Sequence, residues 1–561
     1  MSTRRLNQTK IADQKFKPTG LWVRNPSWPT LTEPAATDQK LVGLYAVFED
    51  VGDSNVAAID FNSTYTINWG DGTSNVSVIG HQTHVYSFSN ANLYDATVTL
   101  TDSTDTITRN NHGYSNADEM YFYRIQTTTG LVEGRLYYVI NATQNTFQVS
   151  ESIGGSAVTL TNDGSASLFP YKIATIVAEA DAGSTVTRIE LNKNTGAFNY
   201  TSVTNWLDLV VAAPNCTSYN HGNNVNIPRF MERFKITSLA STVTDLSILN
   251  DTPNVRECEI PLFTYTGTSL QYRHRNCYNL RVAPYYDTSS VTDFRTWFSG
   301  CNSLERISLY DTSSATLTDS MFQGCSSLKT IPQMDFQNVT SMGNMFNACF
   351  ALESLPEFNM SSCASALNLF NNCANLREVP ALDVSSVTNA QAMFTGCNSL
   401  QYLPPLDFSS ATTLASTFQN CSSLRTLTLT TSSALTNCSN MFNGCASMTY
   451  LPVFDTSAVT NISSMFRTCS SLTEIPDFDF SSVTTVDSTT FTSNRSLRRI
   501  RMTGLGVSFS VANCSLSSDA LNEIYTNLPT VTSKTITVSG NYGVSGDDPT
   551  IATAKGWTVS G

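Results

Sequence analysis

The chain of 561 residues carries 32 Lys and Arg against 45 Asp and Glu, which gives it a formal net charge of −13. An acidic chain without a long basic run is a poor nucleic-acid binder, because neutralising phosphates requires clustered Lys and Arg. No apolar stretch is long enough to span a bilayer as a helix, and five histidines leave little for acid–base or metal chemistry. We therefore expect a non-enzyme without catalytic residues, metal or cofactor, and without nucleic-acid or membrane-inserted partners.

Residues 1–36 are predicted to form an extended docking arm. Four prolines and few acidic residues accompany its basic side chains, and its tryptophans argue against a fully solvated tail. The arm would wrap an acidic neighbour in an assembly, and a disordered tail is the alternative. The residues expected to carry docking are Arg4, Arg5, Lys10, Lys15, Trp22 and Trp28.

The basic residues near the N-terminus are not followed by an apolar segment, so we expect no secretory signal peptide. The protein would then fold in a cytoplasm. Its 14 cysteines would stay reduced there instead of forming a disulfide framework.

Residues 37–93 and 170–195 are predicted to form a β-sandwich interrupted by an insertion. The sequence W-G-D-G-T at 69–73 precedes an H-x-Y strand at 84–86, and the pair resembles the polycystic-kidney-disease (PKD) type of β-sandwich. Asp71 lies in the tight turn, where we expect its carboxylate to be satisfied by its own chain. Calcium binding by Asp71 is the alternative.

Residues 94–169 are predicted to be a small β module inserted into that sandwich. Its segments GLVEGRLYYVINATQNTFQVS and GGSAVTL alternate in the manner of short strands. They resemble small β modules of phage tail and fibre proteins. Insertion at a surface loop is the tolerated way to add a domain.

Internal repetition dominates residues 196–500, where nine cysteines recur every 24 residues from Cys277 to Cys469. Phe usually stands three residues before each Cys, and Leu or Met stands three residues after it. The regular repeats span 277–490, and because one unit cannot bury its apolar face alone, neighbours must stack into a solenoid. The predicted core ladder contains Cys301, Cys325, Cys349, Cys373, Cys397, Cys421, Cys445, Cys469, Phe322, Phe346 and Phe394.

Each repeat is predicted to contain a strand at S-L-x-x-I and a short helix or 3₁₀ turn that begins after D-x-S-S-V-T and ends near the Met-Phe pair. The cysteines are expected to act as small core hydrophobes, because no C-x-x-C pair and no histidine column accompany them. The fold class is therefore mainly β with short helices.

Two polar columns accompany the repeat. The first is a row of aspartates, expected to accept backbone N–H groups in turns, with a calcium or catalytic row as the alternative. The second alternates in sign, so adjacent coils are expected to pair charges across the surface. The aspartates are Asp287, Asp311, Asp335, Asp383, Asp407, Asp455 and Asp479, and the alternating column is Arg281, Glu305, Lys329, Glu353 and Arg377.

Residues 501–561 are predicted to cap the solenoid, because a terminal repeat must cover the end of the apolar column. The segment 515–529 predicts a helix capped by Ser or Asp, and two short strands follow it. Asn494 stands where the next Cys would be. Four arginines lie beside it and are expected to form a solvated rim, with contact to an acidic neighbour or anionic glycan as the alternative: Arg495, Arg498, Arg499 and Arg501.

The repeat sequences MFQGCSSLKTIPQMDF, MFTGCNSLQYLPPLDF and MFRTCSSLTEIPDFDF resemble the BspA-like leucine-rich repeats of bacterial surface proteins. Similar arrays occur in bacteriophage virion structural proteins. The resemblance covers about residues 235–500 and implies the solenoid fold, while repeats of this kind serve as display and adhesion surfaces in many settings.

The resemblance, with the expected absence of a signal peptide, favours a phage virion structural protein of the tail fibre, appendage or decoration type. It would be made in the host cytoplasm, attach to other virion proteins through its N-terminal region, and display the solenoid for contact with a host glycan or protein. A homo-oligomer is compatible with this organisation. A bacterial cell-surface adhesin, a capsid decoration protein without a receptor role and an anionic-glycan depolymerase are the alternatives. The aromatic side chains expected at the ligand surface are Tyr285, Tyr286, Tyr310, Tyr402 and Tyr450.

Overall fold

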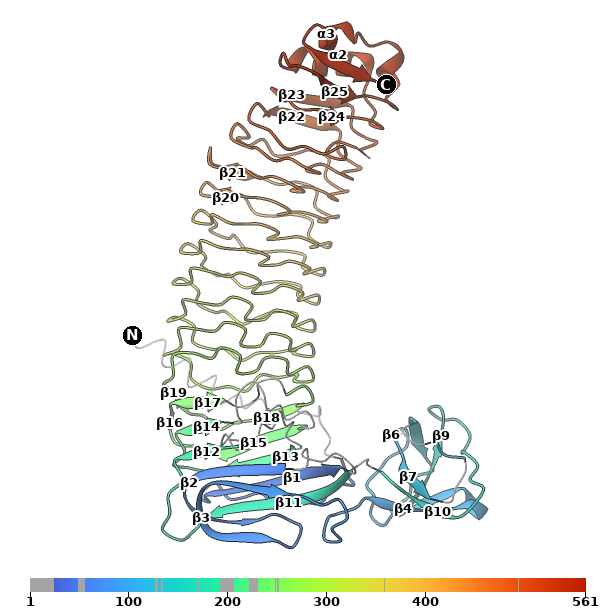
Figure 1. Cartoon of the computed structure of the whole chain (residues 1–561), viewed down its shortest axis with the longest axis vertical. Coiled ribbons are helices and arrows are strands. Elements are labelled where there is room, and N and C mark those ends of the chain that lie inside the picture. Colours follow the sequence, from blue (N-terminus) through green and yellow to red (C-terminus); the bar gives the residue numbers. More distant parts are fainter. Residues whose placement is uncertain are drawn as a thin grey trace. The chain divides into compact units, whose positions relative to one another are not determined.

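The computed structural model describes residues 25–48, 56–126, 130–132, 135–168, 171–191, 206–220, 231–247, 249, 252–357, 359–492 and 494–561. The chain divides into two compact units, residues 1–263 and residues 264–561. Both units are mainly β, as the sequence predicts, and short helices occur near the C-terminus (Figure 1).

Ten strands of the first unit form one sheet in the order β17-β14-β12-β2-β11-β1-β13-β15-β18, with β3 paired to β2. The central strand β11 is antiparallel to both of its neighbours, β2 and β1. On each side they border a parallel run, β12-β14-β17 on one side and β13-β15-β18 on the other. The bounds are β1 Lys40–Phe48, β2 Val56–Asn68, β3 Ser74–Val85, β11 Tyr171–Ala180, β12 Arg188–Glu190, β13 Trp206–Ala212, β14 Ser218–Asn220, β15 Arg233–Ser238, β17 Asp245–Ser247 and β18 Glu257–Glu259.

This topology differs from the predicted separate sandwich. Strands β12 and β13 already pair in parallel with β14 and β15, which is the pairing of stacked coils, so coil stacking begins at about residue 188 instead of 196. Strands β2 and β1 then pair antiparallel with β12 and β13 of that first coil. The segments 37–93 and 170–195 therefore close the open end of the coil stack in the first unit, because an exposed end would leave apolar side chains and strand edges uncovered.

The inserted segment forms a seven-stranded sheet of its own, in the order β6-β8-β9-β5-β4-β10-β7 (Figure 1). Its core is continuous with that of the large sheet: Val98 and Phe147 belong to the same buried cluster as Leu44 of β1 and Val210 of β13. The module is thus packed against the sheet. Its elements are β4 Thr97–Thr101, the 3₁₀ helix η2 Asp102–Thr104, β5 Thr106–Thr108, β6 Glu119–Met120, β7 Tyr123–Gln126, β8 Tyr137–Ile140, β9 Thr146–Ser150 and β10 Gly164–Ser167.

The second unit is a stack of coils, and from Cys277 to Cys469 successive coils are offset by 24 residues (Figure 1). Parallel bridges link the residues just after S-S-V-T, for example Leu317 to Ser341 and Ser341 to Ser365. The predicted strand segment S-L-x-x-I makes fewer such bridges, including Val282 to Arg306. The strands of the second unit up to the last coils are β19 Thr264–Tyr265, β20 Leu406–Phe408, β21 Leu429–Thr431, β22 Glu474–Asp479 and β23 Arg499–Thr503, and the short strand β16 Thr242–Val243 belongs to the first unit.

The predicted helix before each Cys is replaced by overlapping tight turns throughout the described part of 277–490. Thr296 and Gly300 have φ of 53° and 79°, which a right-handed helix does not allow. Alternating left-handed residues let N–H groups point at the next coil, as when the Phe298 N–H donates to the Met321 carbonyl oxygen at 2.9 Å. Bonds between coils therefore replace the bonds within a helix.

The C-terminal region contains the predicted helix and strands. Helix α2 (Ser518–Asn527) begins after Ser517, whose side chain accepts the Ala520 N–H at 3.2 Å, and its buried face includes Leu521 and Ile524. Strands β24, β25 and β26 form a parallel sheet. The bounds are β24 Phe509–Ser510, β25 Lys534–Thr537, the 3₁₀ helix η3 Tyr542–Ser545, α3 Thr550–Thr553 and β26 Trp557–Ser560.

Candidate ligand-binding surface

The nine repeat cysteines, which we call the Cys column, stack in the interior and are fully buried. From Cys301 onward each thiol donates to a backbone carbonyl oxygen 27 residues earlier, at 2.9–3.2 Å, and from Cys325 onward that carbonyl belongs to the Phe of the preceding coil. Successive rings from Phe298 to Phe466 stack at centroid distances of 5.4–6.3 Å. Burial raises the pKa of Cys349 to about 12, so the thiol stays a protonated donor.

The Cys column continues beyond the predicted end of the repeats. Asn494 donates through Nδ2 to the Phe466 carbonyl oxygen at 2.9 Å, Cys514 donates to that of Phe491 at 3.2 Å, and Asn541 donates to that of Val511 at 2.9 Å. The sequences V-x-x-C at 511–514 and V-x-x-N at 538–541 repeat the three-residue offset of F-x-x-C. This three-residue offset is the signal in the sequence by which these two further, degenerate coils could have been predicted.

The aspartate row holds turns together. The Asp311 and Asp455 carboxylates each accept the N–H of the Ser two residues later at 3.0 Å. Asn359, in the same row, accepts the Ser361 N–H at 2.8 Å. An amide performs the same task, so the row needs an acceptor and not a charge.

The alternating charged column pairs only once among the described residues. Arg281 donates through Nε to Glu305 at 2.9 Å, while Lys329, Glu353 and Arg377 have no ion-pair partner within 4.0 Å. The expected pairing from coil to coil therefore stops after the first pair, because long side chains gain too little at an exposed surface to be held in place.

The arginines near the C-terminal coils divide into two kinds. Arg499 donates to Glu523 at 2.8 Å, and Arg501 contacts Glu474 and Asp477. Arg495 and Arg498 are exposed, and no ion pair holds them within the described residues. Two of the four arginines that were predicted to form a solvated rim are thus held in ion pairs within the chain.

Asp71 is satisfied by its own chain. Its Oδ1 accepts the Thr73 hydroxyl at 2.6 Å and its Oδ2 lies 2.8 Å from His84 Nε2, while the Tyr86 hydroxyl donates to the Trp69 carbonyl oxygen at 2.8 Å. Burial acts to raise the pKa of Asp71, but the hydrogen bonds from Thr73 and His84 outweigh it and lower the pKa. These contacts link the turn to the H-x-Y strand.

The docking arm prediction must be corrected at Trp28. This side chain is only 4% exposed and belongs to the buried cluster shared by the inserted module and the sheet, so it is not available to a neighbour. Nearby, Glu33 accepts from Arg233 at 2.8 Å and from Lys235 at 2.9 Å, which fixes the segment across β15. The other predicted arm residues, Arg4, Arg5, Lys10, Lys15 and Trp22, lie outside the described residues.

The predicted tyrosine surface separates into two groups. Tyr286 and Tyr310 are buried, and the Tyr310 hydroxyl donates to the Pro284 carbonyl oxygen, so neither belongs to a ligand surface. Tyr285 is 38% exposed and stacks on Tyr310 at 6.1 Å. Tyr402 and Tyr450 are 56% and 66% exposed, and they occupy the same position two repeats apart.

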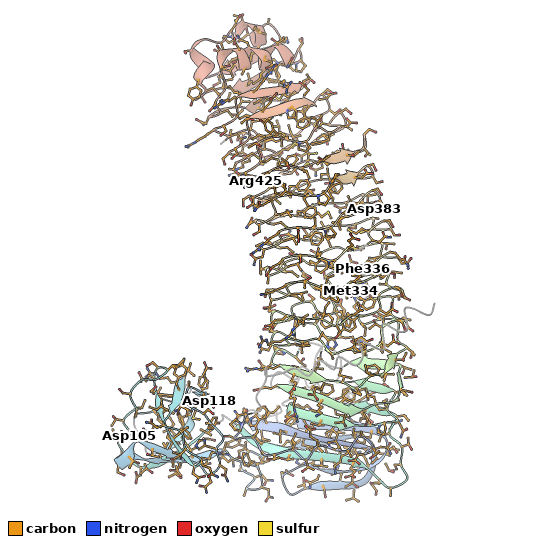
Figure 2. All side chains as sticks on the ribbon, turned by 180° about the vertical axis from the view of Figure 1, so that it is seen from behind. Asp105, Asp118, Met334, Phe336, Asp383 and Arg425 are labelled. Carbon is orange, nitrogen blue, oxygen red and sulfur yellow. The ribbon has the colours of Figure 1, made fainter. Side chains whose placement is uncertain are left out.

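Tyr402 and Tyr450 belong to an array that we call the Tyr–Arg patch, made of the two outward residues of three successive coils. Each pair lies between an inward Leu or Met and an inward aliphatic residue, as Arg425 and Thr426 lie between the buried Leu424 and Leu427. Figure 2 shows Arg425 and Asp383 towards opposite edges of the solenoid. The patch consists of Gln401, Tyr402, Arg425, Thr426, Thr449 and Tyr450.

Within the described ranges, no three His, Cys, Asp or Glu side chains lie close enough together to hold a metal ion. In that same part of the chain, no helix has both the length and the apolar character needed to cross a membrane.

Part of the repeat region is similar to a known family. Three overlapping segments, 268–381, 350–452 and 436–499, match the family model described as "Mycoplasma protein of unknown function, DUF285". Together they cover less than half of the chain. None of the curated proteins is similar enough to the chain to count as a relative.

Solved structures of leucine-rich-repeat proteins are similar at low identity. A leucine-rich repeat protein from Eubacterium ventriosum is 14% identical, with a TM-score of 0.31, covering 56% of this chain and 91% of its own. The TLR13–ssRNA13 complex is 15% identical with a TM-score of 0.22, covering 59% of this chain and 48% of the other. The Toll–Spatzle complex from Drosophila is 15% identical with a TM-score of 0.20, covering 60% and 50%. The chain thus spans about half the length of the last two.

Proposed function

We propose that the chain is a non-enzymatic attachment protein that displays its solenoid at the surface of a particle or cell. The observation that carries this proposal is the pair Tyr402 and Tyr450. Both rings are exposed on hydrogen-bonded coils, and neither stacks on another aromatic ring or makes a side-chain hydrogen bond within the described residues. Aromatic rings that are exposed in the same column of nearby coils offer a rigid, partly apolar surface to a ligand.

Titratable side chains of the repeat support a non-enzymatic role, because the fold already uses them. The thiols donate to backbone carbonyl groups and the aspartates accept turn N–H groups. His274 stacks on Phe298 at 5.2 Å, and its complete burial, with Arg273 nearby, lowers its pKa to about 3. Such groups are poor acids, bases or nucleophiles near neutral pH.

The particle is proposed to be a phage virion, with the N-terminal region bound to other virion proteins. The support is the resemblance of residues 94–169 to phage tail and fibre modules and of the repeats to those in virion proteins. Because Trp28 is buried, docking would rest on residues before position 25. A bacterial cell-surface adhesin is the second candidate, and the match to a mycoplasma family model favours it.

Gold-labelled antibody against residues 196–561, imaged on phage particles and on bacterial cells that carry the gene, tests this proposal. We expect label on virions. Label at the tail or distal fibres would support host attachment, and label over the head would indicate a capsid decoration protein. Label on bacteria but not on virions would replace the phage assignment by the adhesin, and label on neither would contradict surface display.

A further inference from the structure

We propose that the Tyr–Arg patch binds an acidic polysaccharide through a sugar carboxylate. This inference rests on the attachment function proposed above and names the ligand chemistry of the displayed surface. Arg425 is the central cation and Tyr402 and Tyr450 are the flanking stacking residues. Its basis is the placement of one exposed, unpaired arginine between two exposed tyrosines.

The Tyr–Arg patch differs in charge from the chain as a whole. The whole chain carries a net charge of −13, yet the six residues of the patch include no Asp or Glu and one Arg. Arg425 is exposed, and no carboxylate lies within ion-pair distance of it among the described residues. The adjacent coils each bring an acid at the equivalent position, Glu378 on one side and Glu474 on the other. The patch is thus a surface without acidic side chains, and each coil next to it carries a glutamate.

Backbone contacts set the spacing of the side chains in the patch. Tyr402 forms a parallel bridge with Thr426, and the Arg425 N–H donates to the Gln401 carbonyl oxygen at 3.1 Å, so the coils carrying Tyr402 and Arg425 are in register. Parallel chains are about 4.8 Å apart, which places the Tyr402 and Tyr450 backbones about 10 Å apart with Arg425 on the coil between them. An extended oligosaccharide fits this arrangement, with a sugar ring on each tyrosine and a carboxylate between them.

The side chains of the patch suit a sugar that carries a carboxylate. A tyrosine ring offers a rigid apolar face with a polar tip, which suits the apolar C–H face and hydroxyl rim of a sugar. A guanidinium recognises a carboxylate through two parallel N–H donors. A neutral glycan would leave Arg425 without a role. An acidic peptide would pair with Arg425 but has no flat faces spaced for both tyrosines.

Isothermal titration of the full chain tests the inference with four probes. These are an oligogalacturonate, an oligomer of sialic acid, the oligogalacturonate with its carboxyl groups reduced to alcohols, and poly-glutamate. We expect at least one of the two acidic oligosaccharides to bind, and which of them binds identifies the source of the carboxylate. The reduced oligosaccharide and poly-glutamate should bind at least tenfold more weakly.

Variants assign the binding to the patch. Arg425→Gln and the double variant Tyr402→Ala/Tyr450→Ala should each weaken binding at least tenfold, because one charge-assisted bidentate contact accounts for about that factor. Arg498→Gln and Tyr542→Ala are the matched controls and should bind like the parent. Arg498 is an exposed arginine outside the patch, four residues after Asn494 as Arg425 is four residues after Cys421, and Tyr542→Ala removes an 82% exposed ring from the C-terminal region.

Several results would overturn the inference: no binding of either acidic oligosaccharide, equal binding of the reduced one, or unchanged binding after Arg425→Gln. Binding of poly-glutamate alone would assign the patch to an acidic peptide instead. These failures differ from failure of the attachment function. Antibody label on virions or cells without oligosaccharide binding would remove only this inference, whereas binding without any label would remove only the proposed location.

Discussion

The side-chain amide of Asn494 donates to the carbonyl oxygen of Phe466 across 2.9 Å, replacing the thiol that performs this task in the preceding coils. Cys469, one coil earlier, donates its thiol to the Phe442 carbonyl oxygen at 3.0 Å. Asn494 also reaches the Phe491 carbonyl oxygen at 2.8 Å. The Cys column therefore requires a buried hydrogen-bond donor at this position, and either a thiol or an amide can serve.

Asn494→Ala should destabilise the solenoid, because it leaves buried carbonyl groups without a side-chain donor. We expect the free energy of unfolding to fall by about 1–3 kcal/mol, measured by urea unfolding. Asn494→Cys restores a donor and should lose less. Asn398→Ala, at an exposed position of the stack where the side chain makes no hydrogen bond within the described residues, is the control and should change stability by at most about 0.5 kcal/mol. Equal unfolding midpoints for Asn494→Ala and the parent would contradict the donor role.

Buried thiols should make the protein sensitive to alkali. Burial raises the pKa of Cys349 and Cys421 from 9.0 to about 12 in the native state. Between pH 9 and pH 12 these two thiols have lost their protons in the unfolded chain but keep them in the native chain. The contribution of the two thiols to stability is therefore complete below pH 9 and is lost as pH rises towards 12. Urea unfolding at increasing pH should show this fall.

The double variant Cys349→Ser/Cys421→Ser should show a shallower fall above pH 9, because serine does not titrate there. Met345→Leu, at a buried position of the stack that does not titrate, is the control and should keep the parent slope. A double variant whose stability falls with pH as steeply as that of the parent would show that these thiols do not titrate differently in the two states.

The sequence was sufficient to predict the stacked core, because the same buried residue types recur at fixed offsets such as F-x-x-C. It was also sufficient for α2, whose start depends on a local contact between Ser517 and Ala520. The turns before each Cys could not be predicted in this way. Positions with left-handed backbone include Thr296, Ser320 and Ala392, residue types that do not indicate it. Hydrogen bonds to the next coil impose this conformation.

For the candidate surface, aligning the repeat columns would have separated the tyrosines. Tyr310 lies nine residues after its Cys, and the same column holds the buried Met334 and Leu406, which marks it as inward. Tyr402 lies five residues after its Cys, in a column that includes Thr426 and is largely polar. The unpaired state of Arg425 could not be predicted, because it depends on which neighbouring side chains approach it in three dimensions.

Asp71→Asn should destabilise the first unit, because His84 and Thr73 lose a charged acceptor. The folded pKa of Asp71 lies below its ordinary value of 3.8, so its contribution is present above that pH and is lost as pH falls through the lowered folded pKa. We expect a loss of about 1–3 kcal/mol at neutral pH, and the difference from the parent should shrink in acid. Thermal unfolding across this pH range measures it.

The control for this variant is Asp383→Asn. Asp383 accepts the Ser385 N–H at 3.2 Å, and Asn359 makes the equivalent bond at 2.8 Å, so the amide should serve there as well. Calcium added to the parent distinguishes the alternative role of Asp71. A rise in melting temperature in the parent that Asp71→Asn abolishes would show that this carboxylate binds the ion.

Tyr310→Ala should destabilise the protein far more than Tyr402→Ala. Tyr310 is 2% exposed and packs with Trp297 at a ring-centroid distance of 4.5 Å, so its removal should cost about 3–5 kcal/mol of unfolding free energy. Tyr402 is 56% exposed and should be removable at a cost of at most about 0.5 kcal/mol. Urea unfolding of both variants beside the parent tests this. If Tyr402→Ala were as destabilising as Tyr310→Ala, the ring would have a structural role, and it could no longer be regarded as a free surface for ligands.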